Sequence, residues 1–170
     1  RRRIGYEINM AKAGKEARII LKMNALQDPA MIDELYKASE AGVKIDLIVR
    51  GICCLIPNQP YSRNIRITRI VDSFLEHARV WFHHGGKPLL FMGSPDWMRR
   101  NLYRRIEAVT PILDEDLKQQ LIDMLVIQLK DNRKAGWVDE NLNNVLKRNP
   151  KEEPVRAQYA FYEYLKGKNK

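Results

Sequence analysis

The chain contains little cysteine and no long apolar run. Its two cysteines among 170 residues, Cys53 and Cys54, are neighbours in sequence and so are poorly placed to bridge each other. We expect both to be reduced, small core residues of a cytoplasmic protein. No apolar stretch approaches the 18 residues or more that a membrane helix needs, so no transmembrane segment is expected, although peripheral association with a membrane stays open.

Several motifs of nucleotide and metal sites are absent as well. Neither a G-x-x-x-x-G-K-[ST] loop nor a G-x-G-x-x-G loop follows a predicted strand, which excludes the common phosphate-cradling loops. No Cys/His spacing suits zinc, and adjacent His83 and His84 would point to opposite faces of a strand, so no metal site is expected. Residues 1–16 lack the apolar segment of a signal peptide. Because the chain opens on Arg1 within a helical pattern, we expect a fragment of a longer protein.

Positive charge is what the chain has in excess. Lys and Arg total 30 against 21 Asp and Glu, a formal net charge of +9. Such an excess favours polyanionic partners, namely nucleic acid, anionic lipid or chains of phosphate, without choosing among them. The alternative is a basic surface with no partner. A length of 170 residues with 45% hydrophobic and 30% charged residues is typical of one globular domain.

The order of the hydrophobic patterns predicts an α/β fold. Helices are expected over residues 4–14, 29–41, 114–135 and 155–165, and strands over 17–23, 43–49, 64–71, 78–84, 88–93 and 104–113. Pro29 suits the first position of its helix, and the strand–helix–strand segment 17–49 implies a parallel pair. Gly85 and Gly86 suit a hairpin turn. Residues 136–154 are expected to form a surface excursion.

His77 is the first candidate for chemistry. It stands just before the apolar run "VWF" (80–82), at a predicted helix-to-strand junction. Arg79 would point to the same side if the strand has begun, and a neighbouring cation favours the neutral imidazole, which can attack phosphorus or accept a proton. The alternative is a structural histidine.

Arginines supply the other candidates. Arg50 follows the strand 43–49, where its guanidinium could fork onto phosphate oxygens or pair with a loop carboxylate. The segment "GSPDWMRRNLYRRIE" (93–107) adds four more guanidiniums, which together would attract anions. Within that segment, Asp96 and Asn101 could bond to the backbone or orient an imidazole.

Three stretches resemble the carboxyl-terminal region of bacterial polyphosphate kinase (the type 1 family). They are "LIVRGICCLIPN" (47–58), "IVDSFLEHARVWFHHGG" (70–86) and "GSPDWMRRNLYRRIEAVTPILD" (93–114), and the likeness covers nearly the whole chain. It implies that residues 1–170 form a single phospholipase D-like domain, the second of two in a longer kinase chain. The implied fold is a mixed β-sheet flanked by helices.

The resemblance also implies an activity. The family reversibly transfers the terminal phosphate of ATP to inorganic polyphosphate, using Mg2+ and a phosphohistidine intermediate, at a site shared by two phospholipase D-like domains. The implied partners are ATP, ADP and polyphosphate, with no specific nucleic acid, and the full-length enzyme is expected to be a homo-oligomer. This chain alone would carry half of the active site, so we expect it to fold and to bind polyanions weakly without turnover.

Site residues follow from the same resemblance. His77 matches the second domain's active-site histidine, Arg50 the arginine of the R-G-x-C-x-L-I-P motif that handles phosphate, and Arg105 an arginine that contacts the nucleotide's phosphates. Ser94 and Asp96 stand where phospholipase D relatives carry the G-S-x-N stretch that supports histidine, and both are expected to help bind the phosphates. Those relatives have His-x-Lys where this chain has His77-x-Arg79, so Arg79 is expected to clamp phosphate. The expected role of His77 is that of general acid or base, and the alternative is the nucleophile.

Two other functions stay open. One is a phosphodiesterase or nuclease on the same scaffold, which would hydrolyse a phosphodiester without ATP. The other is a non-enzymatic, polyanion-binding module. The clustering of arginines with a histidine at one end of a sheet, rather than along a helix face with aromatic residues between them, argues against the binding module.

Overall fold

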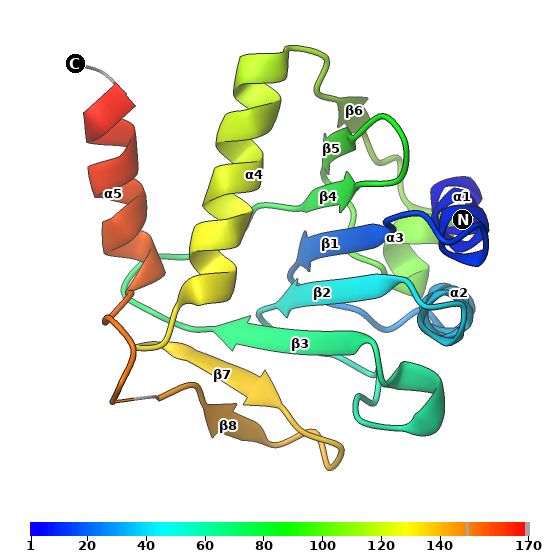
Figure 1. The fold of residues 1–170 in the computed structure, drawn as a ribbon, viewed down its shortest axis with the longest axis horizontal. Coiled ribbons are helices and arrows are strands. Elements are labelled where there is room, and N and C mark those ends of the chain that lie inside the picture. Colours follow the sequence, from blue (N-terminus) through cyan, green and yellow to red (C-terminus); the bar gives the residue numbers. More distant parts are fainter. Residues whose placement is uncertain (149, 169–170) are drawn as a thin grey trace.

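An eight-stranded mixed sheet lies between two layers of helices (Figure 1). The computed structural model describes residues 1–148 and 150–168. From one edge to the other, the strands are ordered β6-β5-β4-β1-β2-β3-β7-β8. Their bounds are β1 Arg18–Met23, β2 Lys44–Val49, β3 Ile65–Ile70, β4 Val80–His83, β5 Leu89–Gly93, β6 Val109–Pro111, β7 Ala135–Val138 and β8 Asn144–Leu146. This is the α/β class with a mixed sheet that the sequence predicts.

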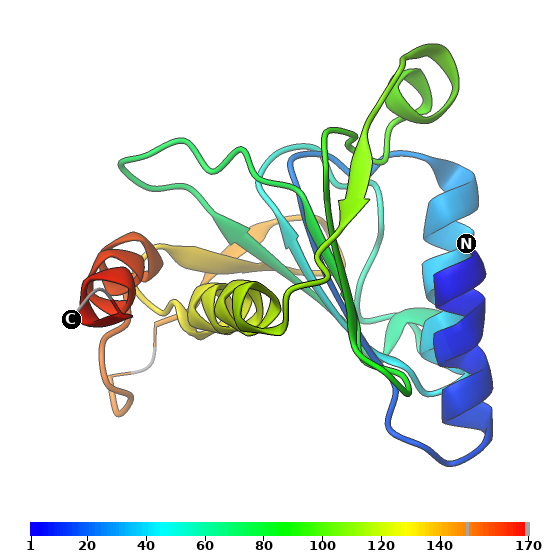
Figure 2. The ribbon, with the colours of Figure 1, turned by 90° about the horizontal axis from the view of Figure 1, so that it is seen from above.

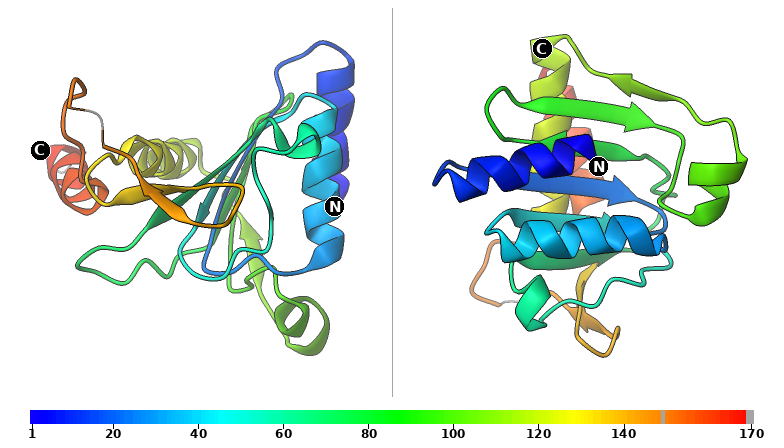
Figure 3. Two further views of the ribbon diagram at one scale, coloured as in Figure 1. Left: turned by 90° about the horizontal axis from the view of Figure 1, so that it is seen from below. Right: turned by 90° about the vertical axis from the view of Figure 1, so that its right-hand side faces the viewer.

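Two helices cover each face of the sheet. The helices α1 (Arg2–Lys12) and α2 (Pro29–Glu40) lie on one face, and α4 (Glu115–Lys130) and α5 (Ala157–Lys168) lie on the other (Figures 2 and 3). The short elements α3 (Arg99–Arg104) and η1 (Pro60–Ser62) lie in connections. No helix within the described ranges is long and apolar enough to cross a membrane.

The centre of the sheet is the predicted parallel unit. β1, β2 and β3 run parallel, with Ile19 opposite Ile45 and Ile45 opposite Ile65. The helix between β1 and β2 begins where its sequence says it should, because the Asp28 carboxylate accepts the N–H of Met31 at 3.0 Å. All three strands therefore end at one edge of the sheet, which we call the carboxyl edge. Their starts form the opposite, amino edge.

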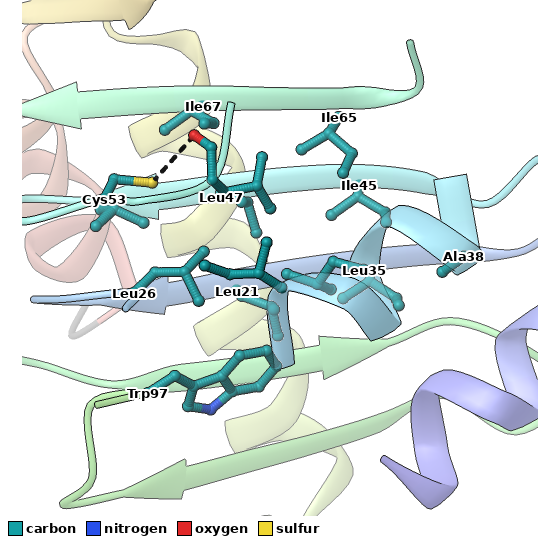
Figure 4. Close-up of a cluster of buried hydrophobic side chains, with 14 of the residues drawn as sticks. Leu21, Leu26, Leu35, Ala38, Ile45, Leu47, Cys53, Ile65, Ile67 and Trp97 are labelled. Atoms are coloured by element: carbon teal, nitrogen blue, oxygen red, sulfur yellow. Dashed lines mark hydrogen bonds between the residues drawn. The ribbon is translucent and has the colours of Figure 1, made fainter. Parts of the chain in front are cut away.

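Alternation along the strands divides the buried side chains into two cores. Leu21, Leu47 and Ile67 face α1 and α2, and Figure 4 shows them packed with Leu35 and Trp97. The second core contains Ile20, Ile48 and Ile70 from the same strands and Leu125 from α4. The period of two thus sends successive residues of each strand to opposite layers, as expected for a sheet covered on both faces.

The two cysteines differ in their surroundings. Cys53 is buried in the first core and its thiol lies 3.9 Å from the carbonyl oxygen of Leu55 (Figure 4). Burial raises the pKa of the Cys53 thiol to about 11. Cys54 is exposed, so the prediction that both are core residues is wrong for Cys54. The irregular loop that follows β2 turns only one of two neighbouring side chains inward.

The prediction of one long strand over 104–113 is wrong. Residues 99–104 form the helix α3, and the strand β6 begins only at Val109. β6 is an edge strand that pairs with β5 alone, a position that tolerates Pro111. The arginine-rich segment therefore forms a helical turn at the carboxyl edge instead of an extended strand.

The predicted end of α4 and the predicted excursion after it are also wrong. α4 ends at Lys130 because the Asp131 side chain accepts the N–H groups of Arg133, Lys134 and Ala135 and turns the chain. Gly136, expected to stop the helix, lies in β7. Residues 135–146 then form the hairpin β7–β8, which extends the sheet beyond β3.

Replacement of Leu47 tests the first core. Leu47 is fully buried in a central strand, so Leu47→Ala should lower the free energy of unfolding by about 2–5 kcal/mol. The matched control Leu117→Ala, at an exposed position of α4, should change it by less than about 0.5 kcal/mol. Urea unfolding followed by circular dichroism measures both. Equal effects of the two substitutions would contradict this description of the core.

Candidate functional site

The carboxyl edge brings together segments that are far apart in the sequence. Arg50 directly follows β2, and Ser94 directly follows β5. Because β4 runs antiparallel to both β1 and β5, its first residue, Val80, also lies at this edge, beside Lys22 and Met92. The segment that carries His77 and Arg79 leads into β4 at the same place.

The Asp96 carboxylate connects these segments. Its Oδ1 atom accepts the backbone N–H groups of Asn24 at 2.7 Å and Ala25 at 3.2 Å, at the end of β1. Arg79 donates from Nε to Oδ1 at 3.3 Å and from Nη2 to Oδ2 at 3.0 Å. Burial raises the pKa of Asp96, but the bonds from Arg79 and the two backbone donors outweigh it and the net pKa is lowered. Asp96 is therefore a buried carboxylate that fixes Arg79.

Asn24 extends the network to Arg50 and His77. Its Oδ1 accepts a hydrogen bond from Nε of Arg50 at 3.1 Å, and its Nδ2 donates to Asp96 and, at 3.5 Å, to the carbonyl oxygen of His77. Gly51 permits this approach, because a Cβ atom there would lie 2.9 Å from the Asn24 carbonyl oxygen. Sequence reasoning missed Asn24. A polar residue directly after a predicted parallel strand was the available signal.

His77 itself lies in an irregular segment. The prediction of a helix-to-strand junction is wrong, since residues 71–79 contain no helix. The His77 side chain is exposed, and its imidazole makes no hydrogen bond with any group in the described part of the chain. Its carbonyl oxygen accepts a hydrogen bond from Nη1 of Arg79 at 2.9 Å. The main chain at His77 is thus held while the ring faces solvent.

A buried ion pair anchors the residue before His77. The Glu76 carboxylate accepts hydrogen bonds from Lys22 Nζ at 2.7 Å, Gln128 Nε2 at 2.6 Å and Gln158 Nε2 at 3.1 Å. Burial lowers the pKa of Lys22. Burial raises the pKa of Glu76, but the Lys22 charge and the hydrogen bonds outweigh it, and the net pKa is lowered. The segment is therefore tied to β1, α4 and α5.

The first residues of α5 and the residue before it hold the same segment. Gln158 accepts the N–H of Phe74 at 2.9 Å and donates to its carbonyl oxygen at 2.8 Å. Arg156 donates two hydrogen bonds to Asp72, at 2.8 and 2.6 Å, and the hydrogen bond from Arg156 lowers the pKa of that carboxyl to about 2. Sequence reasoning predicted α5 but gave it no part in the site.

Arg105 follows α3 in the arginine-rich segment and is exposed. Ser94 Oγ donates a hydrogen bond to Glu107, and Asn101 donates to the other oxygen of that carboxylate at 2.6 Å. These bonds lower the pKa of Glu107, and the charges of Arg105 and Arg79 lower it further. Ser94 and Asp96 thus bond to Glu107 and Arg79, and neither contacts the imidazole. The phosphate-binding roles predicted for Arg105, Ser94 and Asp96 stay predictions.

The described residues do not group into a metal site. No set of three or more His, Cys, Asp or Glu side chains among them is placed to hold a metal ion. His83 is buried, and burial together with nearby positive charge lowers its pKa to about 4, so its imidazole is neutral near pH 7. None of the described residues is therefore assigned to Mg2+.

The fold is that of phospholipase D-like proteins. NucT from Helicobacter pylori superposes with a TM-score of 0.54 at 11% identity, covering 76% of this chain and 88% of that one. The phospholipase D family member Nuc from Salmonella typhimurium superposes with a TM-score of 0.53 at 13% identity, covering 84% of this chain and 89% of that one. At these identities the likeness shows the fold alone.

Closer relatives define the family. The family model described as polyphosphate kinase C-terminal domain 2 matches residues 1–158, and the chain belongs to this family. The crystal structure of polyphosphate kinase from Porphyromonas gingivalis superposes with a TM-score of 0.97 at 58% identity, over 98% of this chain and 26% of that one. Polyphosphate kinase of Yersinia pestis is 49% identical over 96% of this chain. The chain spans about a quarter of such relatives, 24% of the Yersinia pestis protein.

Removal of the Asp96 charge tests the network. Asp96→Asn leaves the buried Arg79 guanidinium unpaired, so the free energy of unfolding near pH 7 should fall by about 3 kcal/mol. A carboxyl whose pKa is lowered by folding stabilises the protein above its unfolded pKa and loses that effect as the pH falls through its folded pKa. The difference in free energy of unfolding between Asp96→Asn and the unsubstituted chain should therefore become smaller below about pH 4.

The matched control for Asp96 is Glu34→Gln. Glu34 pairs with Lys37 on the exposed side of α2, where solvent screens the pair, so only a small change is expected. Urea unfolding at a series of pH values measures both variants. A loss at Asp96 no larger than at Glu34, or one independent of pH, would contradict the assignment of Asp96 as a buried charged anchor.

Proposed function

We propose that this chain forms one wall of the active site of a polyphosphate kinase, which reversibly transfers the terminal phosphate of ATP to inorganic polyphosphate. One observation carries the proposal: the exposed His77 ring lies at an edge where Arg50 and Arg79 are held by the Asn24–Asp96 network. Family membership supports the substrate class. The rest of the site would come from the part of the polypeptide that this chain does not contain.

Arg50 is the guanidinium best placed to bind phosphate. It uses only Nε, in the bond to Asn24, and its two terminal nitrogens make no hydrogen bond with the described residues. Phosphoryl transfer requires mainly positioning and neutralisation of charge on phosphate oxygens, for which two parallel N–H donors are suited. We assign Arg50, together with exposed Arg105, to the phosphates of the nucleotide or of the polymer.

Arg79, expected from the sequence to clamp phosphate, is proposed instead to position His77. Its Nε and Nη2 atoms bond to Asp96 and its Nη1 atom bonds to the carbonyl oxygen of His77. Three of its five N–H donors are therefore used within the protein, which leaves fewer for phosphate than Arg50 has. In the proposed enzyme Arg79 positions His77 and adds positive charge behind it, and Ser94 and Asp96 support the same edge.

His77 serves as general acid or base. In the first step a histidine of the missing domain forms an N–P bond to the terminal phosphorus of ATP, and the P–O bond to ADP breaks. In the second step the terminal oxygen of polyphosphate forms a new O–P bond as the N–P bond breaks. The exposed His77 imidazole is placed to give a proton to, or take one from, these oxygens.

The cofactors and setting follow from the proposed reaction. ATP is the phosphate donor, so we infer a cytoplasmic enzyme. Mg2+ would accompany the phosphates, and no step is assigned to it here because the described residues offer no cluster of ligands. Assembly of the complete enzyme as a homo-oligomer is a further prediction of family membership.

Substitution of His77 in the full-length enzyme tests its role. His77→Ala should lower the rate of polyphosphate synthesis by about 100-fold or more, since it removes the general acid or base. Incorporation of acid-labile phosphate from ATP should persist, because the phosphorylated histidine lies in the other domain. The matched control His84→Gln, at a half-buried position directly after β4, should leave both measurements unchanged. Loss of labelling together with turnover would instead make His77 the nucleophile.

The chain on its own provides a second test. Given ATP, Mg2+ and a polyphosphate primer, the 170-residue chain should make no polyphosphate, because the site is shared with the missing domain. A coupled assay of ADP release measures this. Appreciable synthesis would refute the shared site, and hydrolysis of a phosphodiester without ATP would favour the phosphodiesterase alternative.

A further inference from the structure

The amino edge of the sheet carries a second set of cations, remote from His77. Arg18 and Lys44 are the first residues of β1 and β2, and Arg66 is the second residue of β3. All three lie on the face of the sheet that α4 covers, but α4 packs on that face only further along the strands. A hollow of about 420 Å3 lies there, lined by these three side chains together with Arg63. Lys44 and Arg50 flank opposite ends of β2, roughly 20 Å apart at the rise of an extended strand.

The charges in this hollow are only partly paired. Asp46 accepts both of its bonds from Arg18, at 3.1 and 2.7 Å. The side chains of Lys44, Arg63 and Arg66 make no hydrogen bond or ion pair with any residue that the structure describes. Lys44 is moreover the direct neighbour of Arg18 in the parallel register, a like-charge pair that costs stability. An anion bound between these strands would remove that cost.

A second hollow continues the line of charge. Arg66 also lines a groove of about 640 Å3 that runs past Lys130 and Arg148 toward β8. We call Lys44, Arg63, Arg66, Lys130 and Arg148 the amino-edge track. Carboxylates also border the two hollows, namely Glu16 and Asp46 in the first and Glu152 and Glu153 in the second, yet cations outnumber them in each. The two hollows share a residue, so the track suits an extended anion better than a single phosphate.

The aromatic residue beside the track, Trp137, has one face of its ring covered by Lys147. The ammonium group of Lys147 lies 3.9 Å from the ring centre of Trp137 and donates to the carbonyl oxygen of Leu129 at 2.7 Å. Single-stranded nucleic acids are usually held by bases stacked on open aromatic faces. A polymer that offers charge without bases fits this surface better.

We propose that the amino-edge track is an accessory binding site for the inorganic polyphosphate chain, separate from the candidate active site. The inference rests on the proposed function for the identity of the polymer. A chain bound at both places gains affinity through effective concentration, and only a polymer long enough to span them can do so. Tripolyphosphate is too short to span both sites. Its affinity for the carboxyl edge should therefore not change when charges of the amino-edge track are removed.

Direct binding measurements test the proposal. Titration of the 170-residue chain with long-chain polyphosphate should show a roughly tenfold weaker affinity for the double variant Lys44→Gln/Arg66→Gln, since two exposed charge contacts are lost. The slope of log affinity against log salt should fall by about one to two. The matched control Lys12→Gln/Lys166→Gln removes the same charge from exposed positions outside both hollows and should change affinity less than twofold. Thermal unfolding verifies that every variant is folded.

Each other outcome would overturn the inference. Equal losses in the two double variants would indicate general attraction to a basic protein, and no loss in Lys44→Gln/Arg66→Gln would place the polymer elsewhere. Tighter binding of single-stranded DNA than of polyphosphate at matched charge, lost in the same variant, would make the track a nucleic-acid surface. Because none of these measurements needs turnover, failure here is distinguishable from failure of the proposed kinase activity.

Discussion

One buried carboxylate organises the candidate site. Asp96 comes from the segment after β5, yet it holds the end of β1 through two backbone N–H groups and the entry to β4 through Arg79. A charge in that position is stable only while it is paired and hydrogen-bonded, so the three segments stay together or the network is lost as a unit. The positions of Arg50 and of the His77 main chain depend on this constraint through Asn24.

The free imidazole of His77 contrasts with the fixed backbone beneath it. The preceding residues are bonded to β1, α4 and α5 through Glu76 and Gln158, although the segment has no helix or strand of its own. Such a segment is ordered by side chains from distant parts of the chain. This combination suits a group that acts on a substrate bound between two domains, because the imidazole stays accessible while the main chain fixes its position.

Much of the architecture could be predicted because it depends on local signals. The apolar run of β1, the period of two in β2, the Asp28–Pro29 helix start and the glycine hairpin turn each have a local physical cause. The errors lie where long-range contacts decide. Asp131 ends α4 six residues before Gly136, and β7–β8 are strands only because β3 offers an open edge. No sequence pattern within those segments predicts the end of α4 or the pairing of β7 with β3.

The candidate site divides in the same way. His77, Arg79, Arg50 and Asp96 could be singled out because they flank predicted strands or match a family motif. The bonds from Asn24 to Asp96, from Gln128 to Glu76 and from Gln158 to Phe74 could not be predicted, since each joins positions more than fifty residues apart. The sequence identifies Arg79 as a cation beside His77, and only the structure shows that its guanidinium forms an ion pair with Asp96.

In the proposed enzyme Arg50 and His77 belong to one anion-binding site at the carboxyl edge. Nitrogen-15 NMR of the chain during titration with tripolyphosphate tests this, by following the guanidinium signal of Arg50 and the imidazole signal of His77. A single site predicts that both signals shift with the same dissociation constant. Signals that respond with different constants, or a His77 signal that does not respond at all, would contradict it.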